Sequence, residues 1–232
     1  MEERHAFGVT RGPLRSRLEA KERDPSTERS KFLELMVELK RLEVGSFENN
    51  CYILICSRTR ECVIIDPAAE AERILEETRG TEVTYILITH GHMDHIGALE
   101  EVQAATRAPV AIHEQDARAL RQKPDLFLRG GQTLETGDIS LKVLHTPGHS
   151  PGAVCFLTGK ILFSGDTIFP DGPGNTAIPR ADYQEILRSI HSQIFTLPDD
   201  TIIYPGHGLE TTVGREKKTS FYPLPGNAGR RT

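Results

Sequence analysis

Short apolar runs separated by polar turns dominate the first half of the sequence. Residues 37–44 alternate apolar and charged side chains, which is the pattern of a half-buried strand. Residues 51–56 and 62–65 are continuously apolar and predict buried strands joined by a hairpin loop. Residues 70–78 have the composition of a helix, and residues 83–88 form another apolar run. The first half therefore predicts strands with one helix inserted among them.

The second half continues with strands and then helices. Periodic apolar positions predict an amphipathic helix over residues 183–195, and residues 96–106 predict another. Shorter helices are expected over residues 115–121 and 214–220. The predicted strands are residues 109–113, 133–136, 139–144, 153–157, 161–163 and 201–204. Because strands do not alternate strictly with helices, an α/β (α+β) chain of two mixed sheets with helices outside is expected.

The two ends of the chain differ from this pattern. Residues 1–31 are rich in Arg and Glu and show little apolar periodicity, so they predict a disordered N-terminal extension. Met36 stands just before the first strand, and we hypothesise that it is the functional start. Residues 222–232 are rich in Pro and Gly and predict a flexible tail. The folded domain is expected to span residues 37–221.

Composition and charge narrow the class of protein. The 232 residues are 38% hydrophobic, no apolar run approaches the ~20 residues of a membrane helix, and the N-terminus lacks a secretory signal pattern. The cysteines lack Cys-X-X-Cys spacing and fall in apolar runs, so buried free thiols are expected at Cys51, Cys56, Cys62 and Cys155. A net charge of −5 argues against nucleic-acid binding. A cytoplasmic protein without nucleic-acid or membrane partners is predicted.

A dense group of metal-binding side chains follows the apolar run 83–88. Three histidines and one aspartate fall within six positions, namely His90, His92, Asp94 and His95. His90 and His92 are two residues apart, so on an extended strand end they point the same way. A polar loop that merely contains histidines is the plain alternative, but no packing role explains three imidazoles in six residues. The group lies at the C-terminal end of a strand, where open α/β sheets bind their ligands.

Three later strands end in the same way. His149 stands in Thr-Pro-Gly-His, Asp166 in Gly-Asp, and His207 in Pro-Gly-His-Gly, each directly after an apolar run. The neighbouring glycines allow the backbone to approach closely. Seven candidate ligands at four strand ends therefore predict one metal site.

The remaining histidines lack this setting. His5, His113 and His191 are expected to be ordinary exposed or hydrogen-bonded histidines. His145 precedes His149 by four residues, so it is a candidate for a supporting residue that contacts the ligands.

The motif set His-X-His-X-Asp-His, Thr-Pro-Gly-His, Gly-Asp and Pro-Gly-His-Gly resembles the metallo-β-lactamase superfamily. Within it, the chain is most similar to glyoxalase II-like, or hydroxyacylglutathione hydrolase-like, hydrolases. The resemblance covers residues 37–219 and implies a four-layer αββα sandwich with a metal site at one edge of the two sheets. It implies one metal at His90, His92 and His149, a second at Asp94, His95 and His207, and Asp166 as the bridge between them.

The resemblance also implies a reaction. Two zinc ions, or iron or manganese in their place, would supply a hydroxide that attacks the carbonyl of a small-molecule thioester or related ester. Asp94 would orient the water or move a proton. No Gly-X-Ser-X-Gly motif suggests a serine nucleophile.

The chain departs from the glyoxalase II pattern in some respects, so the identity of the substrate stays open. Full glyoxalase II enzymes carry a C-terminal helical domain that binds glutathione, and the 25 residues after His207 are too few for it. Residues 168–176 also differ from the Gly-Arg-Thr/Ser-Asp-like segment of many glutathione-linked relatives. Lys160, Arg180 and Arg215 are candidates for binding a glutathione carboxylate, but only because of their residue type.

Rival functions share these motifs. A mononuclear iron persulfide dioxygenase would use His90, His149 and Asp166, which form a set of two histidines and one carboxylate. A lactonase is a second alternative, whereas His95 argues against β-lactam hydrolysis. A metal-binding protein without catalysis is a third, although all seven ligand positions are intact.

Overall fold

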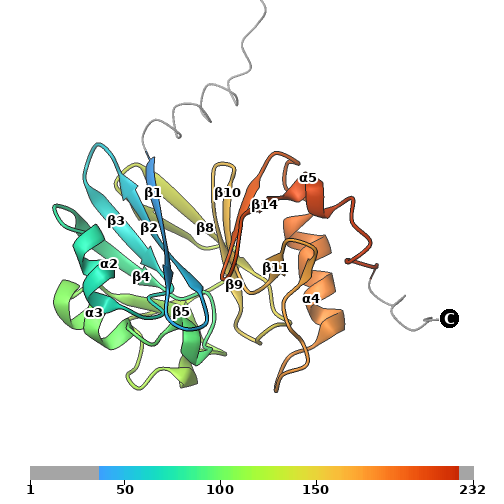
Figure 1. Ribbon diagram of the computed structural model, residues 1–232, viewed down its shortest axis with the longest axis horizontal. Helices are drawn as coiled ribbons and strands as arrows, with labels where there is room; N and C mark the ends of the chain where they lie inside the picture. The colour runs from blue at the N-terminus through green and yellow to red at the C-terminus, as the bar shows by residue number, and fades with distance from the viewer. Residues whose placement is uncertain (1–36, 225–232) are drawn as a thin grey trace, which may run out of the picture.

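The computed structural model describes residues 37–224, and its strands form two sheets that lie face to face (Figure 1). The first sheet has the order β1-β2-β3-β4-β5-β6. Its strands β1 to β3 are antiparallel, and β3 to β6 are parallel. The bounds are β1 Val37–Val44, β2 Asn49–Cys56, β3 Glu61–Ile65, β4 Glu82–Leu87, β5 Val110–His113 and β6 Leu126–Leu128.

The second sheet is also mixed, with the order β14-β13-β10-β9-β8-β7. Only β10 and β13 pair in parallel, and the other neighbours are antiparallel. The bounds are β7 Thr133–Thr136, β8 Ile139–His145, β9 Val154–Thr158, β10 Ile161–Gly165, β13 Ile202–Pro205 and β14 Thr211–Thr212. A small separate ribbon pairs β11 Ile168–Phe169 with β12 Gly172–Pro173. The prediction of two mixed sheets is confirmed.

Helices cover the outer face of each sheet. The helices α2 (Ala71–Glu77) and α3 (Leu99–Thr106) pack on the first sheet. The helix α4 (Tyr183–Ser189), its π-helical continuation η3 (Ile190–Ile194) and α5 (Val213–Glu216) pack on the second. The four-layer αββα arrangement is therefore confirmed.

Strand β2 shows how the sequence builds these layers. All eight of its residues are buried, because both faces of the sheet are covered. Ile53 and Ile55 face the helices α2 and α3, whereas Tyr52 and Leu54 face the second sheet. A third apolar cluster joins the second sheet to α4. The alternation along one strand thus places its side chains in two different cores.

Some predicted helices are shorter than expected. Residues 115–121 form only a 3-10 turn, η2 (Ala117–Ala119), and a second turn, η1 (Met93–His95), precedes α3. The helix expected to begin at residue 96 therefore begins at Leu99. Asp116, next to η2, accepts hydrogen bonds from the backbone of two other loops, so tertiary contacts rather than helical ones hold this segment. The strands β6, β11, β12 and β14 have only two or three residues and were not predicted.

The C-terminal boundary also differs from the prediction. Tyr222, expected in the flexible tail, is buried, and its hydroxyl donates to the Phe169 carbonyl (2.8 Å) and accepts from the Gly172 N–H (3.0 Å). The rest of that tail beyond residue 224, the extension 1–31 and Met36 lie outside the described residues.

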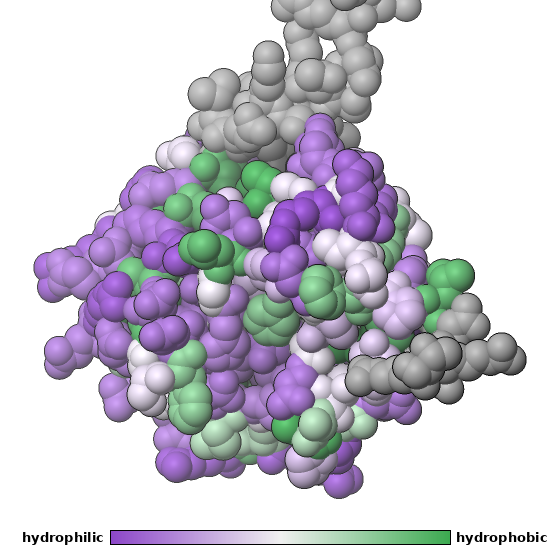
Figure 2. Space-filling model, turned by 45° about the vertical axis from the view of Figure 1, so that its right-hand side comes forward, coloured by the Kyte–Doolittle hydropathy of each residue, from purple (hydrophilic) through white to green (hydrophobic). Residues whose placement is uncertain are grey.

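The four cysteines are buried free thiols, as expected. In the part of the chain that the structure describes, no helix is long and apolar enough to cross a membrane. On the face shown in Figure 2, hydrophobic residues are scattered among hydrophilic ones rather than gathered into one patch.

Candidate metal centre

The two sheets bring the four ligand-bearing strand ends together. Backbone hydrogen bonds hold these strand ends next to one another. The Val154 N–H donates to the Thr89 carbonyl (2.9 Å), and the Gly206 N–H donates to the Gly165 carbonyl (2.8 Å). Gly206 has to be a glycine, because a Cβ there would collide with Asp166. The seven side chains predicted from the sequence meet at this edge.

The first group contains His90, His92 and His149, whose ligand atoms lie within 4.8 Å of one another. His92 Nδ1 and His149 Nε2 are 2.9 Å apart. His90 is buried, and its ring is 4.6 Å from that of His92 and 4.8 Å from that of His149, measured between centroids. Three imidazoles that converge on one point are suited to a metal ion that keeps an open position.

The second group contains Asp94, His95 and His207. Asp94 Oδ2 lies 3.5 Å from His207 Nε2 and 3.7 Å from His95 Nε2. Asn49 was not identified from the sequence, yet its amide donates to Asp94 Oδ2 (3.1 Å) and so fixes the orientation of that carboxylate. Asn49 lies at the start of β2, where no ligand motif marks it.

Asp166 lies between the two groups. Its Oδ2 is 3.5 Å from His149 Nε2 in the first group and 3.8 Å from His207 Nε2 in the second. Its Oδ1 is 3.4 Å from His95 Nε2. From this position, Asp166 could contact a metal in either group.

The outer ring nitrogens of the ligand histidines are also held. His149 Nδ1 lies 2.9 Å from the Asn175 carbonyl, and His207 Nδ1 lies 2.8 Å from the Phe47 carbonyl. Because a carbonyl only accepts, Nδ1 carries a proton in both rings, which leaves Nε2 as the ring atom directed at the site.

Asp66 performs the same task for His95 and was missed in the sequence. It follows the apolar run 62–65, so the rule that ligand residues stand at strand ends could have identified it. Its Oδ2 lies 2.9 Å from His95 Nδ1 and accepts from the Thr89 hydroxyl (2.6 Å), while its Oδ1 accepts from the Thr89 N–H (2.7 Å). Asp66, His90 and His95 also have ligand-type atoms within 4.8 Å of one another, so by distance alone they could form a metal-binding group. Since both oxygens of Asp66 already have donors, we assign it to orienting His95.

Unpartnered buried atoms show that this cluster fits a metal. His90 Nε2, His95 Nε2 and Asp166 Oδ1 are buried and have no hydrogen-bond partner among the described residues. His95 Nε2 and Asp166 Oδ1 are at ion-pair distance, but their geometry is not that of a hydrogen bond. Such orphaned atoms are rare in native interiors because desolvation without a partner is costly. A cation in each group would serve as their partner.

Electrostatics differ between the two groups. Burial lowers the pKa of His90 well below its usual range and also lowers the pKa of His149, so these two imidazoles of the first group are neutral. In the second group, the hydrogen bond with Asp94 raises the pKa of His207. Burial lowers the pKa of His95, but the carboxylates of Asp166 and Asp66 outweigh it and raise that pKa to about 10. A metal in the second group therefore has to displace protons.

The other histidines lie outside the cluster. His145 stacks on His113, with ring centroids 4.2 Å apart and an interplanar angle of 9°, and its Nε2 lies 3.1 Å from the Pro151 carbonyl. His145 thus contacts the loop after His149, and its supporting role stays a prediction. His191 interacts with the Tyr222 carbonyl and Phe195, as expected for a structural histidine.

A profile of the Metallo-beta-lactamase superfamily matches residues 44–207, which includes all seven candidate ligands. The chain belongs to the metallo-β-lactamase superfamily. The resemblance expected from the motifs is therefore confirmed.

Curated relatives in this superfamily match almost end to end. Hydroxyacylglutathione hydrolase GloC of Haemophilus influenzae is 32% identical over 79% of this chain and 97% of its own. The probable metallo-hydrolase YqgX of Bacillus subtilis is 35% identical over 77% of this chain and 93% of its own.

Solved superfamily structures agree with the fold. BLEG-1 B3 metallo-beta-lactamase has a TM-score of 0.75 at 33% identity, covering 78% of this chain and 97% of that one. ETHE1 from Myxococcus xanthus has a TM-score of 0.73 at 28% identity, with coverages of 78% and 82%. TTHA1623, solved in a di-iron-bound form, has a TM-score of 0.67 at 34% identity, with coverages of 78% and 98%.

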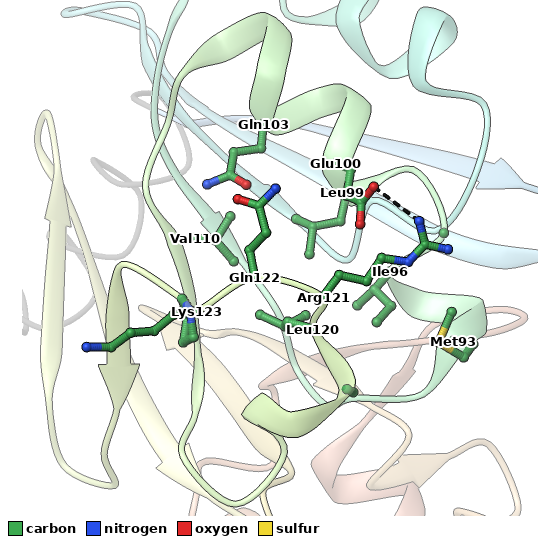
Figure 3. A pocket seen from close by; sticks show the side chains of 13 residues that line it. Met93, Ile96, Leu99, Glu100, Gln103, Val110, Leu120, Arg121, Gln122 and Lys123 are labelled. Carbon is green, nitrogen blue, oxygen red and sulfur yellow. Dashed lines mark hydrogen bonds and ion pairs between the residues drawn. The ribbon is translucent and has the colours of Figure 1, made fainter.

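A cleft lined by both apolar and polar side chains lies next to the ligand loop but contains none of the candidate ligands (Figure 3). It separates α3 from residues 119–124, with Ile96, Leu99 and Leu120 in its lining and Met93 at one end. Arg121 pairs with Glu100 across the cleft (3.4 Å). The candidate metal centre therefore lies outside this cleft, at the edge of the sheets.

Proposed function

We propose that the chain is a metal-dependent hydrolase that cleaves small-molecule thioesters, or related esters, with two zinc ions. The observation that carries this proposal is the complete second group beside the first, with Asp166 between them. A mononuclear enzyme would leave the second group without a metal. The similarity to GloC, a hydroxyacylglutathione hydrolase, supports a thioester as the bond that is cleaved.

The residues fit two zinc ions in the following way. His90, His92 and His149 would hold one ion, Asp94, His95 and His207 would hold the other, and Asp166 would contact both. When bound, the ions supply a water of lowered pKa and positive charge for the developing oxyanion.

The chain itself supplies orientation and proton handling. The hydrogen bond with His207 keeps the pKa of Asp94 below its usual range, so Asp94 is ionised at neutral pH. Its side chain is 27% exposed and is oriented by Asn49, so it can accept a hydrogen bond from an entering water. Asp94 would position the attacking water and accept its proton. Asp66 and Asn175 keep His95 and His149 in place during the reaction.

A mononuclear iron dioxygenase acting on persulfides is the second candidate. That activity would need only His90, His149 and Asp166, and the structure brings these three side chains together. The likeness to TTHA1623 in its di-iron-bound form makes iron a metal to test as well.

We also propose a cytoplasmic location. The supporting observation is that all four cysteines are buried free thiols, as is usual in a reducing compartment.

The test compares metals and substrates on one preparation. Apoprotein is reconstituted with zinc or with iron and assayed for release of a thiol from S-acyl thioesters, for lactone hydrolysis and for oxygen uptake with a persulfide. Thioester hydrolysis by the zinc protein is the expected result. Oxygen uptake by the iron protein without thioester hydrolysis would contradict the proposal and support the dioxygenase.

A further inference from the structure

A groove opens beside His92, and neither Asp94 nor His207 is in its lining. Four segments that are far apart in the sequence form it. Its walls include Gly91, His92, Ser150 and Pro151, and its lining also includes Arg118 and Arg180. Since His92 is a candidate ligand, a molecule in this groove would reach the metal centre.

The two arginines have no carboxylate partner. In residues 37–224, neither Arg118 nor Arg180 forms an ion pair within 4.0 Å, and both are exposed. Arg180 donates from Nη2 to the Gln115 carbonyl (3.2 Å), which ties it to the segment that carries Arg118. In a chain of net charge −5, two unpaired guanidinium groups in one groove form a local site for an anion.

The other cations considered from the sequence are already paired. Lys160 is bound to Asp200, and Arg215 is bound to Asp171 (2.7 Å) and Glu216. Among the three cations that the sequence offered for binding a carboxylate, Arg180 lines a groove that contains a candidate ligand, His92.

Asp116 builds the floor of this groove. It is buried and accepts from the Gly91 N–H (3.1 Å), the Gly152 N–H (3.0 Å) and, through a short contact, the Ser150 hydroxyl. These donors occupy its oxygens, so it does not pair with Arg118 or Arg180. The same bonds fix the turn that bears Arg118 against the loops of His92 and His149.

We propose that this groove is an anion subsite in which Arg118 and Arg180 bind a carboxylate of the substrate. Guanidinium groups match carboxylates in charge and in hydrogen-bond geometry. The inference rests on the proposed function and narrows its substrate class to thioesters that carry a carboxylate on the thiol half or the acyl half. The reactive carbonyl would then lie beside His92, at the centre.

A binding experiment tests the subsite without catalysis. The zinc-reconstituted full chain is titrated by calorimetry with S-ethyl-3-mercaptopropionate, an uncleavable thioether, and with its uncharged amide. We expect the carboxylate to bind roughly tenfold more tightly at low salt, and this preference should shrink as salt screens it. The double variant R118Q/R180Q should bind the two probes equally.

Arg107→Gln is the matched control. Arg107 is exposed, lacks an ion pair in the described structure, and has a positive φ (59°) like that of Arg180 (69°), but it lies far from the groove near the start of β4. It should keep the full preference. Equal binding of both probes by the wild type, or a preference that survives in R118Q/R180Q, would overturn the subsite. The second outcome would indicate that the carboxylate binds the metal directly.

An activity experiment identifies the half that carries the carboxylate. S-acetyl-3-mercaptopropionate and S-succinyl-mercaptoethanol are each compared with their amides through kcat/KM. A roughly tenfold preference for one carboxylate that R118Q/R180Q abolishes assigns the subsite to that half. If no thioester is cleaved but the binding preference holds, the proposed function fails and the anion subsite stands. If thioesters are cleaved and charge has no effect on binding or rate, the subsite fails and the hydrolase stands.

Discussion

Replacing Asp66 by asparagine would perturb the metal centre without removing a candidate ligand. Asp66 is 2% exposed and accepts three hydrogen bonds, two from Thr89 and one from His95 Nδ1. An amide has one acceptor oxygen in place of two. If that oxygen keeps the Thr89 N–H, the amide nitrogen faces His95 Nδ1 and favours the tautomer with the proton on Nε2. That proton would block the atom directed at the second metal group.

The expected magnitude follows from these contacts. Loss of a carboxylate that orients a ligand histidine typically weakens metal affinity by about 10–100-fold, or about 1.4–2.8 kcal/mol. Because the site is buried, solvent does not screen the change. The metal-free protein should also lose about 1.5–3 kcal/mol of stability, since one hydrogen bond to a charged acceptor is lost.

Competition against a chromophoric zinc chelator measures the change. We expect D66N to bind the first zinc as the wild type does and the second roughly 10–100-fold more weakly. The control is D125N, because Asp125 also accepts from a backbone N–H, that of Val110 (2.9 Å), but lies away from the ligands. It should leave both affinities unchanged. Unchanged affinity for both ions in D66N would refute the role assigned to Asp66.

Three further predictions concern metal, packing and pH. His92→Ala should lose one zinc and the activity while its circular dichroism stays native, and wild-type turnover would contradict the assignment of His92. Phe156→Ala should cost about 3–5 kcal/mol in urea unfolding, because Phe156 is fully buried between the two sheets, and a loss below about 1 kcal/mol would contradict that packing. Burial and His145 lower the pKa of His113 below its usual 6.5, so the unfolded chain takes up the proton first. The stability from His113 should be complete above pH 6.5 and decline as the pH falls, and His113→Gln should reduce this slope in unfolding titrations.

The sequence predicted those parts of the site that short motifs encode. His90, His92, Asp94 and His95 are close in the chain, and His149, Asp166 and His207 follow apolar runs that form strands, so their convergence could be expected once two sheets were inferred. Period-2 alternation and continuous apolar runs located the strands because burial on one or two faces determines those patterns.

Residues whose role depends on tertiary contacts could not be predicted in this way. Asn49 and Asp116 act on loops that are 45 and 25 residues away in sequence, and no local pattern marks such a partner. Arg180 was a candidate only by residue type and Arg118 was not identified, because nothing in the sequence shows that the fold places both in one groove. The burial of Tyr222 could not be predicted either. Its hydroxyl donates to the Phe169 carbonyl, which is distant in the sequence, and nothing in the proline-rich tail indicates that contact.

The number of metal ions per chain tests the central claim most directly. Protein purified without chelator and protein reconstituted with zinc or iron would be analysed by mass spectrometry for bound metal. We predict two ions per chain, with zinc supporting thioester hydrolysis, and one ion per chain in Asp94→Ala. A single iron per chain in the wild type, unchanged in Asp94→Ala, would contradict the binuclear hydrolase.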